Sequence, residues 1–170
     1  MSAIASFYFL PAAKREALEG AARTGAVYPR RFLFVSFGRF QPSPFPAFLA
    51  NHAREDNGFA WSGWAFYWLD LFLEEMDRPS LTTCCIEPLS GEVSRAQGGG
   101  VWFFDGDGAR KLASSLDGLS VPPDVLARVL PHAPAEQDFS CEAVRGAAET
   151  LREWLAQLGD DTLGLLDIGA

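Results

Sequence analysis

The segment from Ala60 to Met76, AWSGWAFYWLDLFLEEM, constrains the fold of this chain more than any other part of the sequence. Placed on a helix at about 100° per residue, its apolar and mostly aromatic side chains leave only one narrow polar side. So wide an apolar surface is typical of a helix that is buried on most sides. The segment is shorter than the roughly 20 apolar residues that cross a bilayer, and it ends in acidic residues. We therefore predict a Trp-rich central helix and no membrane span.

Short aromatic or branched segments elsewhere predict strands. The clearest are Ala5–Leu10, Val101–Asp105 and Thr162–Ile168. The Phe-rich segment Arg31–Phe40 favours a further strand or an extended buried segment. The prolines at 42, 44 and 46 that follow it predict a loop, because each restricts the preceding residue to extended geometry.

Apolar periodicity and helix-end residues predict further helices. They cover Ala12–Ala22, Pro46–Glu55, part of Glu87–Ala96, Ala109–Leu116, Pro123–Leu130 and a helix capped by Ser140 that ends near Leu158. No linker or repeat divides the chain. We therefore predict one α+β domain over residues 1–170, with a small mixed sheet packed against the central helix and about four further helices.

The composition is that of a globular protein, and its charge is uneven. Hydrophobic residues make up 48% and charged residues 21% of the 170 residues, and the net charge is −8. Residues 1–54 carry seven bases and two acids, a net charge of +5, whereas residues 55–170 carry seven bases and twenty acids, a net charge of −13. The excess of acid argues against a nucleic-acid partner and favours a basic protein as the partner of an acidic face. Alternatively, the two parts neutralise each other within one fold.

The cysteines and histidines predict no metal or cofactor. Cys84, Cys85 and Cys141 are odd in number and two of them are adjacent, which is a poor disulfide framework and fits a reducing, cytoplasmic location. His52 and His132 lie too far from the cysteines and from each other to suggest a zinc site.

Two glycine motifs also predict turns rather than ligand sites. Asp105-Gly106-Asp107-Gly108 resembles the start of a calcium loop, but Leu116 occupies the position where an acid is required. We expect a turn in which Asp107 caps the following helix. The run Gly98–Gly100 precedes a strand and lacks the helix start and lysine of a phosphate-binding loop.

Asp70, Glu74 and Asp77 recur at helical spacing on the narrow polar side of the central helix. Carboxylates that lie close together in a partly apolar cleft can separate their pKa values and share acid and base roles. The same stripe is also typical of the solvated edge of a buried helix. Beside it, Trp61 and Trp64 could form an aromatic wall for a small molecule. Both interpretations of the stripe stay open.

The order of these elements resembles a known family. An aromatic N-terminal strand, the Trp-rich helix, Val101–Asp105 leading into a helix, and a final amphipathic helix running into Thr162–Gly169 are similar to the YfbM-like bacterial proteins. The resemblance covers most of the chain as a pattern of elements. It implies a small cytosolic α+β protein and transfers no catalytic residues, because none is established for the family.

The sequence therefore favours a non-enzymatic cytoplasmic protein that binds another protein, such as a toxin-neutralising immunity-type inhibitor. The binding residues expected are Asp70, Glu74, Asp77, Trp61 and Trp64. The alternative is a small enzyme or small-molecule binder whose site is built from the same residues. The oligomeric state is not predicted.

Overall fold

A four-stranded sheet forms the centre of the computed structural model, which describes residues 3–28, 30–32, 35–37, 39–129 and 141–169. The strands are β1 (Ile4–Pro11), β4 (Arg54–Asp56), β5 (Gly100–Phe104) and β6 (Thr162–Gly169), in the order β4-β1-β6-β5. All three pairings are antiparallel, which corrects the expectation of a mixed sheet. The α+β class is confirmed.

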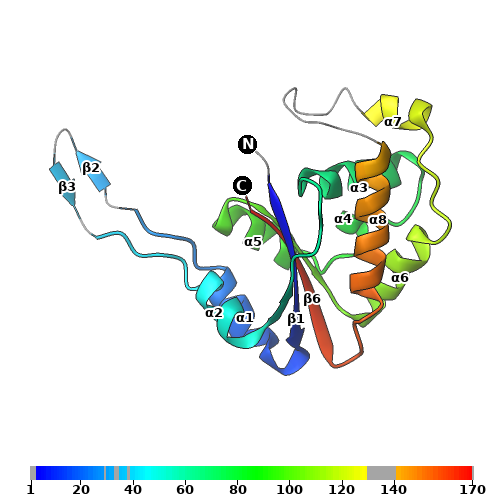
Figure 1. The fold of residues 1–170 in the computed structure, drawn as a ribbon. Helices are drawn as coiled ribbons and strands as arrows, with labels where there is room; N and C mark the ends of the chain where they lie inside the picture. Colours follow the sequence, from blue (N-terminus) through cyan, green and yellow to red (C-terminus); the bar gives the residue numbers. More distant parts are fainter. Residues whose placement is uncertain (1–2, 29, 33–34, 38, 130–140, 170) are drawn as a thin grey trace.

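The two long strands lie side by side at the centre of the sheet (Figure 1). They pair over their full length, from Ile4 opposite Gly169 to Pro11 opposite Thr162. Because successive side chains of a strand point to opposite faces, each strand contributes to two separate cores. Phe7 of β1 and Leu166 of β6 lie in one core, whereas Leu10 and Leu165 lie in the other.

The larger core lies under one layer of helices, seen to the right of the sheet in Figure 1. The layer contains α3 (Trp64–Glu75), α4 (Leu81–Cys84), α6 (Gly106–Leu116), α7 (Pro123–Val129) and α8 (Cys141–Leu155). Helix α3 packs against both α7 and α8 and buries Phe66, Trp68 and Phe72. The predicted central helix is therefore confirmed.

The smaller core lies on the opposite face of the sheet (Figure 1). It is covered by α1 (Arg15–Ala22), which follows a short 3-10 turn (Ala12–Lys14), and by α2 (Phe45–His52) and α5 (Leu89–Gln97). Helix α5 also lies along β5. Its Ser90 hydroxyl accepts a hydrogen bond from the backbone N–H of Phe103 in that strand, at 3.0 Å. The sheet is thus covered on both faces, by unequal layers.

Helix α3 begins at Trp64, four residues later than the start of the predicted segment, because the chain first contacts the sheet at Gly63. The Gly63 N–H donates to the Ala3 carbonyl at 2.8 Å. A Cβ at Gly63 would lie 3.1 Å from the backbone of Ala5 and equally close to Ile168. A side chain here would require these neighbours to shift by a few tenths of an ångström, so glycine favours the close approach.

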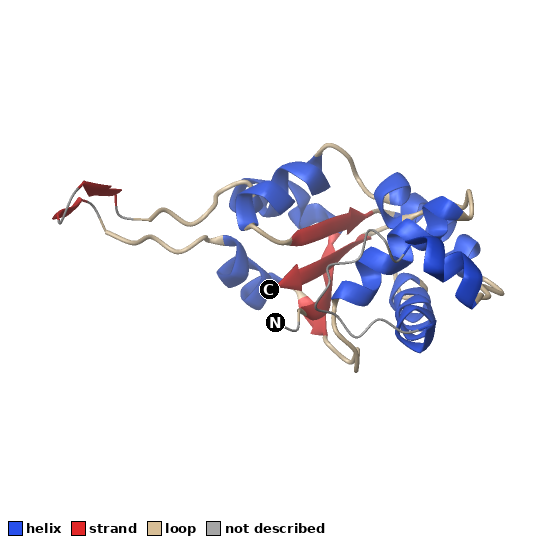
Figure 2. Ribbon diagram, turned by 90° about the horizontal axis from the view of Figure 1, so that it is seen from above, coloured by secondary structure: helices blue, strands red, loops and turns tan. Residues whose placement is uncertain are grey.

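The segment between α1 and α2 forms a projecting arm, defined here as residues 25–43 (Figure 2). Within it, β2 (Arg30–Phe32) and β3 (Val35–Phe37) pair as an antiparallel ribbon, and Val27 and Gln41 form an isolated bridge nearer the body. The arm joins no strand of the central sheet. The expected strand at Arg31–Phe40 is therefore two short strands, and it is not an element of the body.

The other predicted elements are present with shifted ends. Helix α2 ends at His52, since the next residues form strand β4, whose charged sequence gives no strand signal. Helix α4 has four residues and was not predicted. Asp105 rather than Asp107 caps α6, and its carboxylate accepts from the Gly108 N–H at 2.8 Å. The Ser140 cap lies outside the described residues.

Candidate functional site

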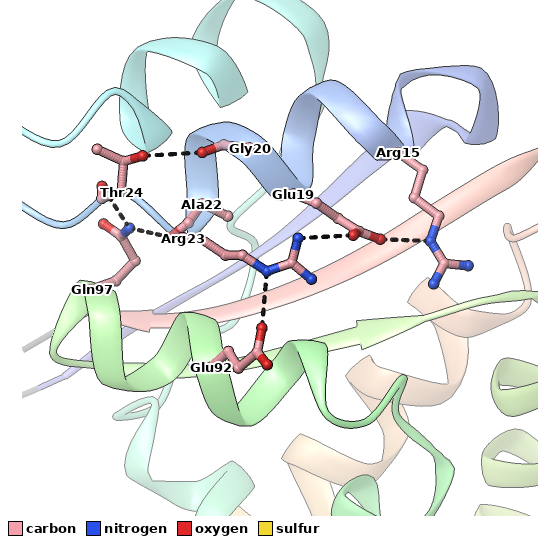
Figure 3. A network of polar contacts seen from close by, with 8 residues as sticks. All are labelled: Arg15, Glu19, Gly20, Ala22, Arg23, Thr24, Glu92 and Gln97. Carbon is pink, nitrogen blue, oxygen red and sulfur yellow. Dashed lines mark hydrogen bonds and ion pairs between the residues drawn. The ribbon is translucent and has the colours of Figure 1, made fainter.

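The root of the arm is fixed to the body by a network of polar contacts between α1 and α5 (Figure 3). The Arg23 guanidinium pairs with Glu92 at 2.9 Å and with Glu19 at 3.1 Å. The Gln97 amide donates to the carbonyls of Ala22 and Thr24, at 2.6 Å and 3.3 Å. These contacts hold the point at which the chain leaves helix α1.

The two sides of the arm are joined just beyond this root. The Ser43 hydroxyl donates to the Thr24 carbonyl at 2.9 Å, and Val27 and Gln41 exchange two backbone hydrogen bonds of 2.8 Å and 2.9 Å. Gly25 approaches α5 so closely that a Cβ there would lie 2.6 Å from the Ala96 carbonyl oxygen. The arm therefore starts in a direction set by the body.

Beyond the root, the arm exposes apolar side chains. Tyr28 is 72% exposed, and Val27 and Phe40 are each 54% exposed. The rings of Tyr28 and Phe40 contact each other between the two sides of the arm, with centroids 5.4 Å apart. Arg39 beside them is exposed as well. The sequence of the arm contains three arginines and no acid, and its described exposed side chains include both aromatic and basic ones.

A second polar surface lies on the sheet, on the face that carries the smaller core. We call it the acidic sheet end, and it comprises Ile4, Ser6, Tyr8, Glu55 and Asp167. The Glu55 carboxylate accepts from the Ser6 hydroxyl at 2.8 Å and from the Tyr8 hydroxyl at 3.3 Å. Asp167 lies directly opposite Ser6 in the register of β1 and β6. Two carboxylates from distant parts of the sequence thus share one sheet face.

The environment of Asp167 disfavours its charged form. Burial raises the pKa of this carboxyl to about 6, and the negative charge of Glu55 adds to the shift. Burial also raises the pKa of Tyr8, with a further contribution from Glu55. At neutral pH, Asp167 therefore carries a charge that a nearby cation would stabilise.

The three carboxylates of the predicted acidic stripe do not meet at one site. Asp70 is buried, with 8% of its surface exposed, and it contacts the start of helix α4. Its two oxygens accept from the Thr82 N–H at 3.0 Å and from the Thr82 hydroxyl at 2.7 Å. Asp70 thus satisfies a free N–H in the first turn of a helix, as a carboxylate at a helix N-terminus does.

The other two members of the stripe are exposed near the end of α3. The carboxylate of Glu74 accepts from the Ser80 hydroxyl at 3.5 Å. Asp77 has a positive φ of 51° and lies where the helix has ended. Sequence spacing places these side chains on one side of a helix, but burial separates Asp70 from the exposed pair.

The two tryptophans predicted as an aromatic wall have different neighbours. Trp61 is 46% exposed and lies against α8, where a Cβ at Gly146 would be 3.3 Å from its ring. Trp64 instead makes a tilted ring contact with Tyr67, with centroids 5.0 Å apart, and the edge-on contact of Tyr67 with Trp102 of β5 has a centroid distance of 5.1 Å. Trp64 therefore belongs to a row of rings that ends on the sheet.

A shallow cleft of about 180 Å³ lies between the end of α6 and the side of α8. Its polar lining consists of Arg145, Glu149 and Arg152, and Arg152 pairs with Asp117 at 3.4 Å. Sites for drug-sized ligands usually enclose roughly 300–1,000 Å³. This cleft is smaller, and none of the predicted site residues lines it.

The cysteines and His52 do not come together as a metal site. In the part of the chain that the structure describes, no group of three or more His, Cys, Asp or Glu side chains is placed to hold a metal ion. All three cysteines are free, and burial raises the pKa of Cys85 to about 11, which keeps its thiol protonated. The ring of His52 contacts the ring of Phe48 in a tilted arrangement, whereas His132 lies outside the described residues.

Comparison of the chain with protein-family models, curated proteins and solved structures found no match. The resemblance to YfbM-like proteins therefore stays a prediction from the order of elements. Among the described residues, no helix is long and apolar enough to cross a membrane.

Proposed function

We propose that this chain is a non-enzymatic protein-binding module whose arm is the main binding element. The observation that carries the proposal is the exposure of Val27, Tyr28 and Phe40, which belong to the arm that projects from the body (Figure 2). Exposed apolar patches rimmed by polar residues are typical of interaction sites. Aromatic residues and arginine are also the types enriched at protein interfaces, and the arm is rich in both.

A more specific function can be proposed from the sequence. We propose a cytoplasmic inhibitor of the kind represented by toxin-neutralising immunity proteins. The small size, the net charge of −8 and the three free cysteines support it. Its test is co-expression with the products of neighbouring genes. A product that stops growth when expressed alone, and no longer does so together with this chain, is the expected result.

The arm can be removed without cutting into the body, which gives a direct test. Because Val27 and Gln41 are paired, residues 28–40 can be replaced by Asn-Gly, a two-residue turn that joins antiparallel strands. We expect the shortened chain to keep its melting temperature and to lose the bound proteins that the native chain retains. The proposal would be contradicted if the native and the shortened chain bound the same proteins equally well, or associated with copies of themselves equally well.

A second candidate surface is the exposed pair Glu74 and Asp77, which the charge distribution predicts to attract a basic protein. The double substitution Glu74→Lys with Asp77→Lys should slow association with such a partner. The matched control is Asp124→Lys, which reverses an exposed charge at the start of α7. An equal effect of both variants would indicate general electrostatics and not a site. The small-molecule alternative has less support, because Asp70 is already engaged by Thr82.

A further inference from the structure

The arm is basic in sequence, whereas the acidic sheet end carries the two carboxylates Glu55 and Asp167. Between Glu19 and Glu55 the sequence holds five arginines and no acid, and three of these arginines belong to the arm. The arm extends away from the sheet in both views (Figures 1 and 2). The ribbon of β2 and β3 therefore lies apart from the central sheet that carries the acidic sheet end.

The acidic sheet end has the features that such a ribbon would contact. Glu55 is exposed, Asp167 is half-buried, and Ile4 beside them is 70% exposed. The surface thus combines two carboxylates with an open apolar side chain and the ring of Tyr8. The arm offers the complementary set, namely Arg39 with Val27, Tyr28 and Phe40.

We propose that the arm of one copy of this chain lies on the acidic sheet end of a second copy. In the proposed dimer the contact is made twice. The arm of each copy lies on the acidic sheet end of the other, related by a two-fold axis, so the assembly is closed. The inference rests on the proposed function, since it names the partner of the same arm. Charge complementarity selects a second copy, as the bases and the acids that match are both present on this chain.

The contact would relieve an unfavourable charge on the body. Burial and Glu55 both disfavour the ionised form of Asp167, and an arginine placed beside it would favour that form. The fixed root of the arm reduces the ordering that binding requires, since Arg23 and Gln97 already hold its base (Figure 3).

The first test is the mass of the native chain in solution by sedimentation, over a range of concentrations. The measurement is made near physiological ionic strength, where charges more than about 8 Å apart are largely screened. We expect a monomer–dimer equilibrium. The variant Arg39→Glu should weaken it at least about tenfold, whereas Arg145→Glu, an exposed reversal on α8, should leave it unchanged. A native chain that remains monomeric up to high micromolar concentration would overturn the proposal.

The decisive test mixes two variants with exchanged charges. The arm variant carries Arg30→Glu, Arg31→Glu and Arg39→Glu, and the sheet variant carries Glu55→Lys and Asp167→Asn. Each variant alone should be monomeric, because the arm of one copy then carries the same sign of charge as the sheet end of the next copy, or is not attracted to it. Mixed, they should form a one-to-one dimer, since each arm meets a sheet end of favourable charge. Failure of the mixture to associate would contradict the proposed contact.

Further measurements keep the result interpretable. Circular dichroism establishes that both variants are folded, and Glu55→Lys alone replaces the sheet variant if that one unfolds. A dimer that survives excision of residues 28–40 overturns the inference, because the copies then associate elsewhere. Arm-dependent binding of a different protein by a monomeric chain also overturns it, yet leaves the proposed function intact. Arm-dependent sedimentation with phosphatidylserine vesicles, without binding to any protein, overturns both.

Discussion

The substitution Asp70→Ala removes the carboxylate that two hydrogen bonds from Thr82 hold at the start of helix α4. The sequence places Asp70 in a candidate binding stripe, whereas its contacts indicate a structural role. The two roles predict opposite signs for the change in stability. Removing a carboxylate kept for a ligand tends to stabilise the folded protein, because such sites trade stability for function. Removing one that satisfies a helix end destabilises it.

The expected loss follows from the geometry. A hydrogen bond to a charged group contributes about 1.5–3 kcal/mol, but the two bonds here are not additive. Thr82 is exposed, so water can replace part of what is lost, and relief of the buried charge offsets a further part. We therefore expect Asp70→Ala to lower the free energy of unfolding by about 2 kcal/mol. Asp70→Asn, which keeps one acceptor oxygen, should cost about half as much.

Urea denaturation measures these changes, provided that the dependence on denaturant is the same in each variant. Thr82→Val removes only the hydroxyl donor, so a double-mutant cycle with Asp70→Ala isolates the pair, and we expect a coupling of about 1 kcal/mol. Glu74→Ala, one turn further along the exposed stripe, is the matched control and should change stability by less than about 0.5 kcal/mol. An unchanged or more stable Asp70→Ala protein would refute the structural assignment and return Asp70 to the candidate site.

Three further predictions test the core, the sheet and the arm root. Trp68→Ala should cost about 3–5 kcal/mol in chemical denaturation, because Trp68 is 3% exposed; a loss below about 1 kcal/mol would contradict its place in the core. The Asp167 pKa of about 6 lies above the ordinary value, so the folded state binds its proton more tightly, and this group's contribution to stability falls as the pH rises from about 4 to 6. Asp167→Asn should remove this dependence and stabilise the monomer near pH 7 by about 2 kcal/mol; equal pH curves for both proteins would contradict it. Gly25→Ala should destabilise the folded chain, because the new Cβ would clash with the Ala96 carbonyl oxygen. Gly20→Ala, which has open space around it in helix α1, should stabilise the folded chain by about 0.5–1 kcal/mol. Melting curves of the two variants compare the signs.

The elements that periodicity predicts are those with a long apolar pattern. Helix α3 and the strands β1, β5 and β6 follow from such patterns, because burial of one or both sides leaves a repeat in the sequence. Strand β4 does not, since its three charged residues pair only because the edge of β1 is available to them. Helix α4 likewise depends on tertiary contacts with Asp70 and on the Ser80–Thr83 capping box.

The candidate surfaces depended on information that the sequence holds only in part. The Phe-rich segment from Arg31 to Phe40 was expected in the body, because apolar residues are usually buried, yet Phe40 is exposed. The sequence around Asp167 marks it as unusual, because a charged residue follows Leu163 and Leu165 on the same face of one strand. Its partner Glu55 is not marked in this way, because only the pairing of β1 with both β4 and β6 brings the two carboxylates together.

The pairing of β1 with β6 also has a consequence for synthesis in the cell. Residues 4–11 emerge from the ribosome well before residues 162–169, the strand that covers their edge. Until then β1 has only the three-residue β4 to pair with, and Phe7 and Phe9 lack the neighbours that bury them. Contacts so distant in sequence form slowly, and exposed strand edges promote aggregation. We therefore expect the nascent chain to need a chaperone until residues 162–169 have been synthesised.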